Sequence, residues 1–567
     1  MKSRIILILL SYMLLTLPLS FAEDIDLSKP YPLSLLPYPG KGVLGQSDQN
    51  IIAIIENIKI NSDNTSEFQN EENVCINPTN TDNAVAVWRD FREGYRRVGV
   101  GYTFDAGLTW TDALITVYPP YGRQSDPVLW VDRDGNFYLS GLDIEWDWLY
   151  SGISVYKSTD GGLSWSAPTW VVGGHYEYFE DKQWFAMDQT GSSGDGNIYC
   201  VWDRFSASQS YTGIVCATSV DNGLTFSEPV AVSAYDYDYV QWPTVTVGPT
   251  STVYVAWYDH RTPRRISFAR SYDYGVSFTP EQGIITLDSA YTTLNGSILC
   301  FPFPAMACDV YPGSDHFGNL YIIYADGESD WDIWCRRSAD GGISWSDKVR
   351  VNDDPMANGC DQFHPWLSID NDGAIHVCFL DRRDDPGNML YNVYYTKSVD
   401  GGLTWEANQR VSTVSSDPGQ AALAGLLGEY IGISVWNGEV QMVWTDIRNL
   451  NQDVYSARIT PSISLEYLPG DVNMANGAWP PLVIGGDVTY LVNYFRSLPS
   501  SQACLLDGFW CSADANGDCL IIGSDVTRLV NYFRGLSDIN YCPDYEPAWP
   551  TPDDLPEDAP QDWPNCE

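Results

Sequence analysis

The sequence predicts an all-β fold of seven repeated units, each with four short antiparallel strands. Three observations lead to this prediction. An eight-residue turn sequence with a fixed Asp, Gly and aromatic residue occurs six times, and a short apolar strand follows each copy. A strand ending in Asp occurs seven times, and Tyr, Trp, Gly and Pro are abundant. The repeat of about 50–67 residues suits one blade of a β-propeller, so we expect seven blades in a ring.

The turn sequence combines a tight hairpin with an aromatic anchor. In the copy from Ser158 to Trp165, Asp160 supplies a side-chain acceptor, and the two glycines after it tolerate positive φ. The aromatic residue five positions after the Asp can fold back beneath the hairpin. The aspartates that hold this place are Asp105, Asp160, Asp221, Asp273, Asp340 and Asp400.

These octets resemble the Asp-box, or BNR, repeat of the sialidase superfamily. The resemblance covers about residues 57–460 and implies that each octet caps the hairpin between the two outer strands of a blade. It implies a protein that engages glycans, either as a glycoside hydrolase of exo-sialidase-like type or as a non-catalytic carbohydrate- or protein-binding surface-assembly protein.

The second strand of each unit ends in Asp. A residue type that every unit carries serves the fold, so we interpret these aspartates as structural rather than catalytic. Arginines one or two residues later are their expected ion-pair partners. The aspartates are Asp90, Asp143, Asp203, Asp259, Asp326, Asp381 and Asp446, and the arginines are Arg92, Arg204, Arg261, Arg383 and Arg448.

The last unit lacks a fourth strand after it. A strand of matching pattern, Ile58–Asn61 (IKIN), stands at the start of the repeats and resembles VRVN at 349–352. We expect it to pair with the strand at 454–460 and to complete the last blade. Such closure removes the free edge of an open ring.

The N-terminus has the features of a secretory signal. Residues 1–22 carry Lys2 and Arg4, then the apolar stretch 5–17, then the small-x-small site 20–22. The alternative is an uncleaved anchor. No later stretch is long and apolar enough to span a bilayer. The net charge of −43 disfavours nucleic acid and anionic membranes and suits a secreted, extracellular protein.

An oxidising compartment favours disulfides among the 13 cysteines, although their odd number leaves at least one without a partner within the chain. Cys200 and Cys216 lie on strands that we expect to pair within one blade. We therefore predict a disulfide between them. The N-terminal lead, residues 23–56, lies between the signal and the repeats and contains no clear secondary-structure element.

Residues 466–541 contain a duplicated unit whose apolar residues recur at helical spacing, and an acidic, Pro-rich tail follows at 542–567. Each copy begins with oxygen-bearing residues spaced as in an EF-hand calcium loop. The candidate ligands are Asp471, Asn473 and Asp487 in the first copy, and Asp514, Asn516, Asp518, the Leu520 carbonyl and Asp525 in the second.

This duplicated unit resembles a dockerin module, which implies calcium binding and anchoring to a cohesin-like or cell-surface protein. In cellulosomal dockerins, the two residues before the last Asp of each loop recognise the cohesin partner through hydroxyl groups. Here these residues are Gly485-Gly486 and Gly523-Ser524, which lack most of those groups. Anchoring to another surface module, or docking onto the propeller itself, therefore stays open.

A sialidase clamps its substrate carboxylate with three arginines and uses a Tyr–Glu pair and an Asp. The Arg-Ile-Pro tripeptide usual in that family is absent from this sequence. Glu429 and Tyr430 are adjacent, but neighbours on a strand point to opposite faces. No catalytic set is therefore assigned from the sequence.

We expect the ligand site where the chain enters the first strand of each blade, on the face opposite the octets. Aromatic rings there stack on sugars, while carboxylates bind hydroxyl groups or transfer protons. The alternative is that these aromatics fill gaps between blades. The ring is Asn73, Asp126, Trp184, Trp242, Phe303, His364 and Glu429. The candidate substrate-binding residues are Asp126, Trp184, Trp242, His364, Glu429 and Tyr430.

Overall fold

The structure is a computed structural model that describes residues 53–54, 57–206, 212–234, 240–289, 291–327, 330–420 and 427–460. The predicted signal sequence, most of the lead, both calcium loops and the acidic tail lie outside the described residues.

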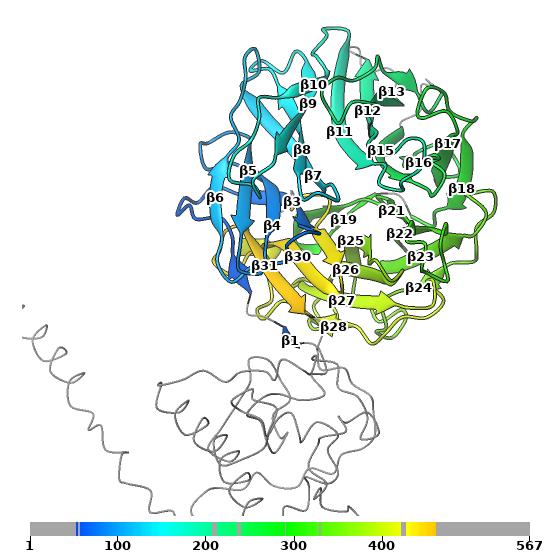
Figure 1. Ribbon diagram of the computed structural model, residues 1–567. Helices are drawn as coiled ribbons and strands as arrows, with labels where there is room; N and C mark the ends of the chain where they lie inside the picture. Colours follow the sequence, from blue (N-terminus) through cyan, green and yellow to red (C-terminus); the bar gives the residue numbers. More distant parts are fainter. Residues whose placement is uncertain are drawn as a thin grey trace, which may run out of the picture. The chain divides into compact units, whose positions relative to one another are not determined.

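The described residues form an all-β propeller of seven blades, each a four-stranded antiparallel sheet (Figure 1). The first three blades are β3 (Gln69–Ile76), β4 (Ala84–Asp90), β5 (Arg97–Thr103), β6 (Thr111–Leu114); β7 (Arg123–Val131), β8 (Phe137–Ile144), β9 (Ser151–Ser158), β10 (Thr169–Val172); and β11 (Tyr178–Met187), β12 (Ile198–Ser206), β13 (Thr212–Ser219), β14 (Val230–Ala231). The next three are β15 (Val240–Val247), β16 (Val253–Asp259), β17 (Arg265–Ser271), β18 (Gln282–Thr286); β21 (Ala305–Cys308), β22 (Leu320–Asp326), β23 (Asp332–Ser338), β24 (Val349–Arg350); and β25 (Gln362–Ile369), β26 (Ile375–Asp381), β27 (Asn392–Ser398), β28 (Gln409–Arg410).

The seventh blade takes its outer edge from the other end of the chain. It contains β29 (Gly432–Trp436), β30 (Glu439–Asp446) and β31 (Asp453–Thr460). Strand β2 (Ile58–Lys59) pairs with β31, as the sequence predicted, and β1 (Ala53–Ile54) extends the same edge. The ring is therefore closed by backbone hydrogen bonds between its first and last strands.

One hairpin between the fourth and fifth blades was not predicted. It consists of β19 (Thr292–Leu294) and β20 (Ile298–Cys300), joined by the 3-10 turn η1 (Asn295–Ser297). A second 3-10 turn, η2 (Pro418–Gln420), precedes the seventh blade. No helix in the described part of the chain could cross a membrane.

Each octet connects the third and fourth strands of its blade. In the second blade, Asp160 Oδ1 accepts hydrogen bonds from Ser158 Oγ at 2.8 Å and from Ser164 N at 2.9 Å. The glycine two residues after the Asp has positive φ in every octet, and φ is 96° at Gly162. A Cβ there would lie 2.7 Å from Val85 of the first blade, so this glycine also allows adjacent blades to pack closely.

The second strands form the centre of each blade and bury the largest side chains. Trp88, Trp202, Trp257 and Trp444 are fully buried at equivalent positions. In the first blade, the Trp88 indole donates to Asp90 at 2.7 Å, and Arg92 pairs with the same carboxylate at 2.7 Å. The corresponding ion pairs are Asp259–Arg261 at 2.6 Å, Asp381–Arg383 at 2.8 Å and Asp446–Arg448 at 2.8 Å. These four predicted pairs are confirmed.

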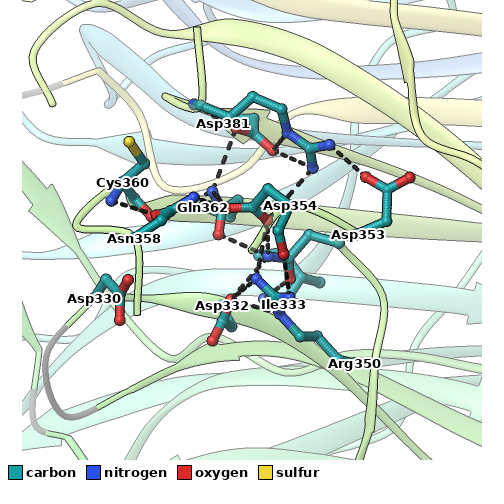
Figure 2. Close-up of polar contacts among 12 residues, drawn as sticks. Asp330, Asp332, Ile333, Arg350, Asp353, Asp354, Asn358, Cys360, Gln362 and Asp381 are labelled. Atoms are coloured by element: carbon teal, nitrogen blue, oxygen red, sulfur yellow. Dashed lines mark hydrogen bonds and ion pairs between the residues drawn. The ribbon is translucent and has the colours of Figure 1, made fainter. Parts of the chain in front are cut away.

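The buried side-chain amide of Asn352 joins the fifth blade to the sixth, and we call the polar cluster around it the latch. Asn352 Nδ2 donates hydrogen bonds to Asp332 at 2.8 Å, to Asp354 at 2.7 Å and to Gln362 at 2.7 Å. Figure 2 shows these three acceptor residues gathered together. Asp354 also pairs with Arg350 at 2.9 Å. Because these groups satisfy one another, this polar cluster is structural.

The ring closure repeats this latch with residues from the two ends of the propeller. Asn61 Nδ2 donates to Asp63 at 2.8 Å and to Asp453 at 3.0 Å, and Lys59 pairs with Asp453 at 2.9 Å. The sequence likeness between the segments after Ile58 and after Val349 therefore reflects the same contacts. Residues 59–63 therefore connect the seventh blade to the first in the same way as residues 350–354 connect the fifth to the sixth.

The predicted disulfide is wrong. Cys200 and Cys216 do lie on paired strands, but both are free thiols. Cys200 lies opposite Ala217, and Cys216 lies opposite Val201. This offset of one residue places the two side chains on opposite faces of the sheet.

Candidate functional site

Five inner strands share a β-bulge whose first residue has positive φ. The register shifts between residues 70 and 73, 125 and 128, 181 and 184, 241 and 244, and 363 and 366. The left-handed residues are Glu71 (62°), Asp126 (49°), Lys182 (49°), Trp242 (55°) and His364 (48°). Positive φ is unfavourable for such side chains and concentrates at functional sites. The backbone repeats here while the chemistry does not, which makes these positions the candidate site.

The sequence placed two members of this ring wrongly. Glu71 and Lys182 hold the positions that were given to Asn73 and Trp184. Asp126, Trp242 and His364 are each followed by proline, which aligned them correctly, whereas the other two bulges have no proline. Asn73 instead accepts a hydrogen bond from the Leu129 N–H at 3.3 Å and helps to join two blades.

Lys182 is the centre of the site. Its side chain is only 3% exposed, and its Nζ lies 3.6 Å from the Tyr430 ring centroid and 5.3 and 5.8 Å from those of Phe303 and Trp184. Glu429 Oε2 is 3.9 Å from the same nitrogen. Nζ has no hydrogen-bond partner among the described residues. An ammonium group enclosed by rings, with donors unused, is suited to a polar ligand.

The aromatic residues around Lys182 pack against one another as a wall, and Trp242 belongs to a second aromatic group. Trp184 and Trp366 have ring centroids 4.4 Å apart, and Phe303 stacks on Trp366 at 5.4 Å. Trp242 packs on Phe301 at 4.3 Å. These rings are mostly buried. These aromatic rings therefore fill gaps between blades, which was the alternative to sugar stacking, and they also border the charged groups around Lys182.

Glu429 and Tyr430 both contact Lys182, contrary to the expectation that they face opposite ways. They precede β29 instead of lying on it, so the alternation of a strand does not apply. Gly428, with φ of 89°, turns the chain just before them. The Tyr430 hydroxyl donates to the Pro127 carbonyl at 3.1 Å, which fixes the ring over the ammonium.

Asp203 does not belong with the structural aspartates. The bulge of β11 lies opposite Trp202, as that of β3 lies opposite Trp88. Asp203 is therefore equivalent to Arg89, one residue before the structural Asp90. Its Oδ2 accepts a hydrogen bond from Trp242 N at 3.2 Å, and its Oδ1 has no partner in the described part.

The third blade supplies its structural carboxylate from another strand. Arg204 occupies the position of the strand-terminal Asp, and Glu180 of β11, opposite it, provides the acid group at 2.6 Å. Glu180 also accepts from the Trp202 indole at 2.6 Å, as Asp90 does from Trp88. The exchange of roles leaves Asp203 available to the site. The predicted pairing of Arg204 with Asp203 is wrong.

The carboxyl groups around Lys182 differ sharply in acidity. Burial alone would raise the pKa of Asp126, but the positive charges of Lys182 and Arg89 hold it below its ordinary value. Burial, with repulsion from Asp126 and Glu429, raises the pKa of Asp181 to about 8. The environment of Asp126 therefore favours its ionised form, and that of Asp181 favours its protonated form.

Three further carboxyl groups complete the cluster. Burial raises the pKa of Glu71 to about 8, even though Arg89 pairs with it at 2.6 Å. Burial also raises the pKa of Glu429 and, together with Asp181, that of Asp203. A cluster of this kind, with Glu71 and Asp126 at strained positions, is typical of a site for proton transfer.

His364 stands apart from this cluster. Its Nε2 lies 3.3 Å from the Leu299 carbonyl of the unpredicted hairpin, and burial lowers its pKa to about 4. The structure thus brings Asp126, Trp184, Glu429 and Tyr430 together around Lys182, with Trp242 beside Glu429 and Asp203. The sequence missed Lys182, Asp181, Glu71 and Asp203.

No protein-family model and no curated protein matches this chain. The solved structures with similar folds include an α-L-arabinanase from Penicillium chrysogenum bound to arabinobiose, which is 13% identical with a TM-score of 0.42 and covers 72% of this chain and 99% of its own. An intramolecular trans-sialidase from Ruminococcus gnavus is 14% identical, with 70% and 96% covered and a TM-score of 0.39. A lectin from Burkholderia pseudomallei is 11% identical, with 60% and 84% covered and a TM-score of 0.40. Sialidases and arabinanases are thus among the neighbours in fold, and identities this low say nothing of the chemistry.

Proposed function

We propose that this protein is a glycoside hydrolase that acts at the carboxyl cluster around Lys182. The observation that carries the proposal is the placing of Asp126 and Asp181 at the bulges of neighbouring inner strands, β7 and β11, where their environments shift their pKa values in opposite directions. Glycosidases need one carboxylic acid and one carboxylate across the scissile bond. An aromatic wall beside them suits the apolar face of a sugar ring.

Each carboxyl group takes the role that its charge allows. Asp181, protonated and only partly buried, donates its proton to the glycosidic oxygen as the leaving group departs. Asp126, ionised beside Lys182, stabilises the positive charge that develops on the sugar or attacks it. Lys182 binds a sugar hydroxyl group through its unused donors.

The cations of the site favour a neutral sugar. Each of the two buried cations already lies against a carboxyl group, Arg89 at 2.6 Å from Glu71 and Lys182 at 3.9 Å from Glu429. The cluster therefore lacks the three free arginines with which a sialidase clamps the carboxylate of its substrate. We therefore favour neutral polysaccharides over sialoglycans.

The test is turnover of a panel of aryl glycosides, both neutral and sialylated. Asp181→Asn should lower kcat by about 100-fold or more on substrates with poor leaving groups, and by much less on dinitrophenyl glycosides, which need no acid. Asp126→Asn should impair both kinds. Asp221→Asn, in an exposed octet, is the matched control and should keep wild-type rates. Equal losses for Asp181→Asn on both substrate kinds would rule out its acid role.

A non-catalytic carbohydrate-binding protein is the second candidate. The existing ion pairs of Arg89 and Lys182 favour it, because they leave a balanced site that can bind sugars without any reaction. Binding on a glycan array without turnover of any glycoside would establish this alternative.

We propose further that the protein is secreted and that residues 466–541 bind calcium as an anchoring module. The spacing of Asp514, Asn516, Asp518 and Asp525 supports this, since their mutual repulsion is relieved by a divalent cation. Calorimetric titration of the full chain should detect about two calcium ions. Fewer should bind to the variant that combines Asp514→Ala and Asp518→Ala, and unchanged uptake would contradict the proposal.

A further inference from the structure

The loop between β8 and β9 exposes aromatic side chains that the fold does not use. Trp146 and Trp148 are 49% and 44% exposed. Indole rings that fill space between blades are buried, as Trp88 and Trp202 are. Leaving two indoles of one loop partly in water is costly, and such patches mark binding surfaces.

Both indoles are held in fixed orientations. The Arg123 guanidinium lies 4.8 Å from the Trp146 ring centroid and 5.4 Å from that of Trp148, and Arg96 lies 5.0 Å from Trp148. Phe179 stacks against Trp148 with its ring plane inclined by 14°. Rigid rings lose little conformational entropy when a ligand packs on them.

The loop backbone is also built for this arrangement. Trp148 has φ of 59°, an unfavourable conformation for a bulky residue. The Glu145 carboxylate accepts a hydrogen bond from Asp147 N at 2.8 Å and stabilises the turn. A side chain at Gly122 would collide with the Trp146 ring, so this glycine is needed for the ring to lie where it does.

The exposed pair is continuous with the carboxyl cluster. Phe179, which stacks on Trp148, lies two residues before Asp181 on β11, so the two side chains lie on the same face of the blade. Arg96, whose guanidinium lies 5.0 Å from the Trp148 ring centroid, also favours the ionised forms of Asp126 and Asp181 through its positive charge. A ligand at the cluster that extends along this face meets Trp148.

We propose that Trp146 and Trp148 form a further sugar-binding subsite, so that the protein takes an oligosaccharide or polysaccharide rather than a single terminal sugar. This inference rests on the proposed action on glycans. Flat aromatic faces bordered by arginine donors suit a neutral sugar, whose C–H face stacks on the ring while its hydroxyl groups accept hydrogen bonds. Continuity with the cluster favours a glycan over a protein partner.

The experiment is native electrophoresis of the full chain in gels that contain soluble arabinan, arabinoxylan, galactan or glucomannan. A polysaccharide that retards the wild type should bind about tenfold more weakly to the variant combining Trp146→Ala and Trp148→Ala. Phe at both positions should restore part of the affinity. Gly122→Ala, which displaces Trp146 without removing a ring, should also weaken binding. Tyr272→Ala, 67% exposed on an octet, is the matched control and should migrate as wild type.

The outcomes separate this subsite from the proposed hydrolysis. Wild-type affinity in the double Ala variant, with its melting temperature unchanged, would overturn the subsite even if aryl glycosides are turned over. Weaker binding in that variant without turnover of any glycoside would support the subsite and overturn the hydrolase. No retardation of the wild type by any polysaccharide would overturn the glycan assignment and leave the patch as a protein-docking surface.

Discussion

At the scale of single residues, the inner-strand bulges place charged groups where the fold gives them few partners. Glu72, the second residue of the β3 bulge, is fully buried. Its Oε1 accepts a hydrogen bond from Thr445 Oγ1 at 2.6 Å, and its Oε2 has no partner among the described residues. Burial raises its pKa to about 8. Glu72 is therefore protonated at neutral pH, and ionising it costs stability.

This residue predicts how stability depends on pH. Because the pKa is raised in the folded state, the contribution of Glu72 is complete below the unfolded pKa of about 4.3 and is lost as pH rises towards 8. Glu72→Gln removes this titration. Its melting temperature should fall less than that of wild type between pH 5 and pH 8. Glu228→Gln, at an exposed position, should follow the wild-type profile, and identical profiles for all three proteins would contradict the prediction.

Single residues were also where the sequence predicted least. Asp203 looked like one more strand-terminal aspartate, and only the pairing of β11 with β12 reveals that it is displaced by one residue. Lys182 lay two residues from its expected register, because bulges add residues without a sequence signal. The paired strands of Cys200 and Cys216 were anticipated, but the offset that separates the thiols depends on the register.

At the scale of elements, the octets, strands and blade order followed from the sequence because each is repeated. Repetition averages out local uncertainty, and each copy must satisfy the same hairpin and the same packing. The β19–β20 hairpin occurs once and carries no such pattern, so it was not predicted. The latch at Asn352 was predicted only in part. The likeness between the segments that end at Asn61 and Asn352 was visible in the sequence, but the contacts that the two residues make were not.

The latch makes a prediction about the connection between blades. Asn352→Asp replaces an amide donor by a carboxylate that faces Asp332 and Asp354. We expect unfolding free energy to fall by about 2–4 kcal/mol, because three hydrogen bonds are lost and like charges meet. Denaturant unfolding at pH 7 measures this. Asn371→Asp, at an exposed position, should change stability little, and an equal effect of the two substitutions would refute the role of the latch.

At the scale of the whole molecule, the propeller depends on a strand that comes from the far end of its sequence. Deleting residues 23–62 removes β1, β2 and Asn61 and should leave β31 as an open edge. We expect a lower melting temperature and aggregation. Deleting only 23–52, which spares these strands, is the matched control. A melting temperature that is unchanged after the longer deletion would contradict closure.

The same closure has a mechanical consequence. Ala53 of β1 lies opposite Thr460 of β31, and Ile58 of β2 lies opposite Ser456, so the propeller's two ends leave one edge at the same point. A force that pulls residues 53 and 460 apart loads these antiparallel pairs one after another, beginning with Ala53 and Thr460, instead of shearing them all together. Under tension, β1 and β2 would separate from β31 first, and the ring would open there while the other six blades stay folded.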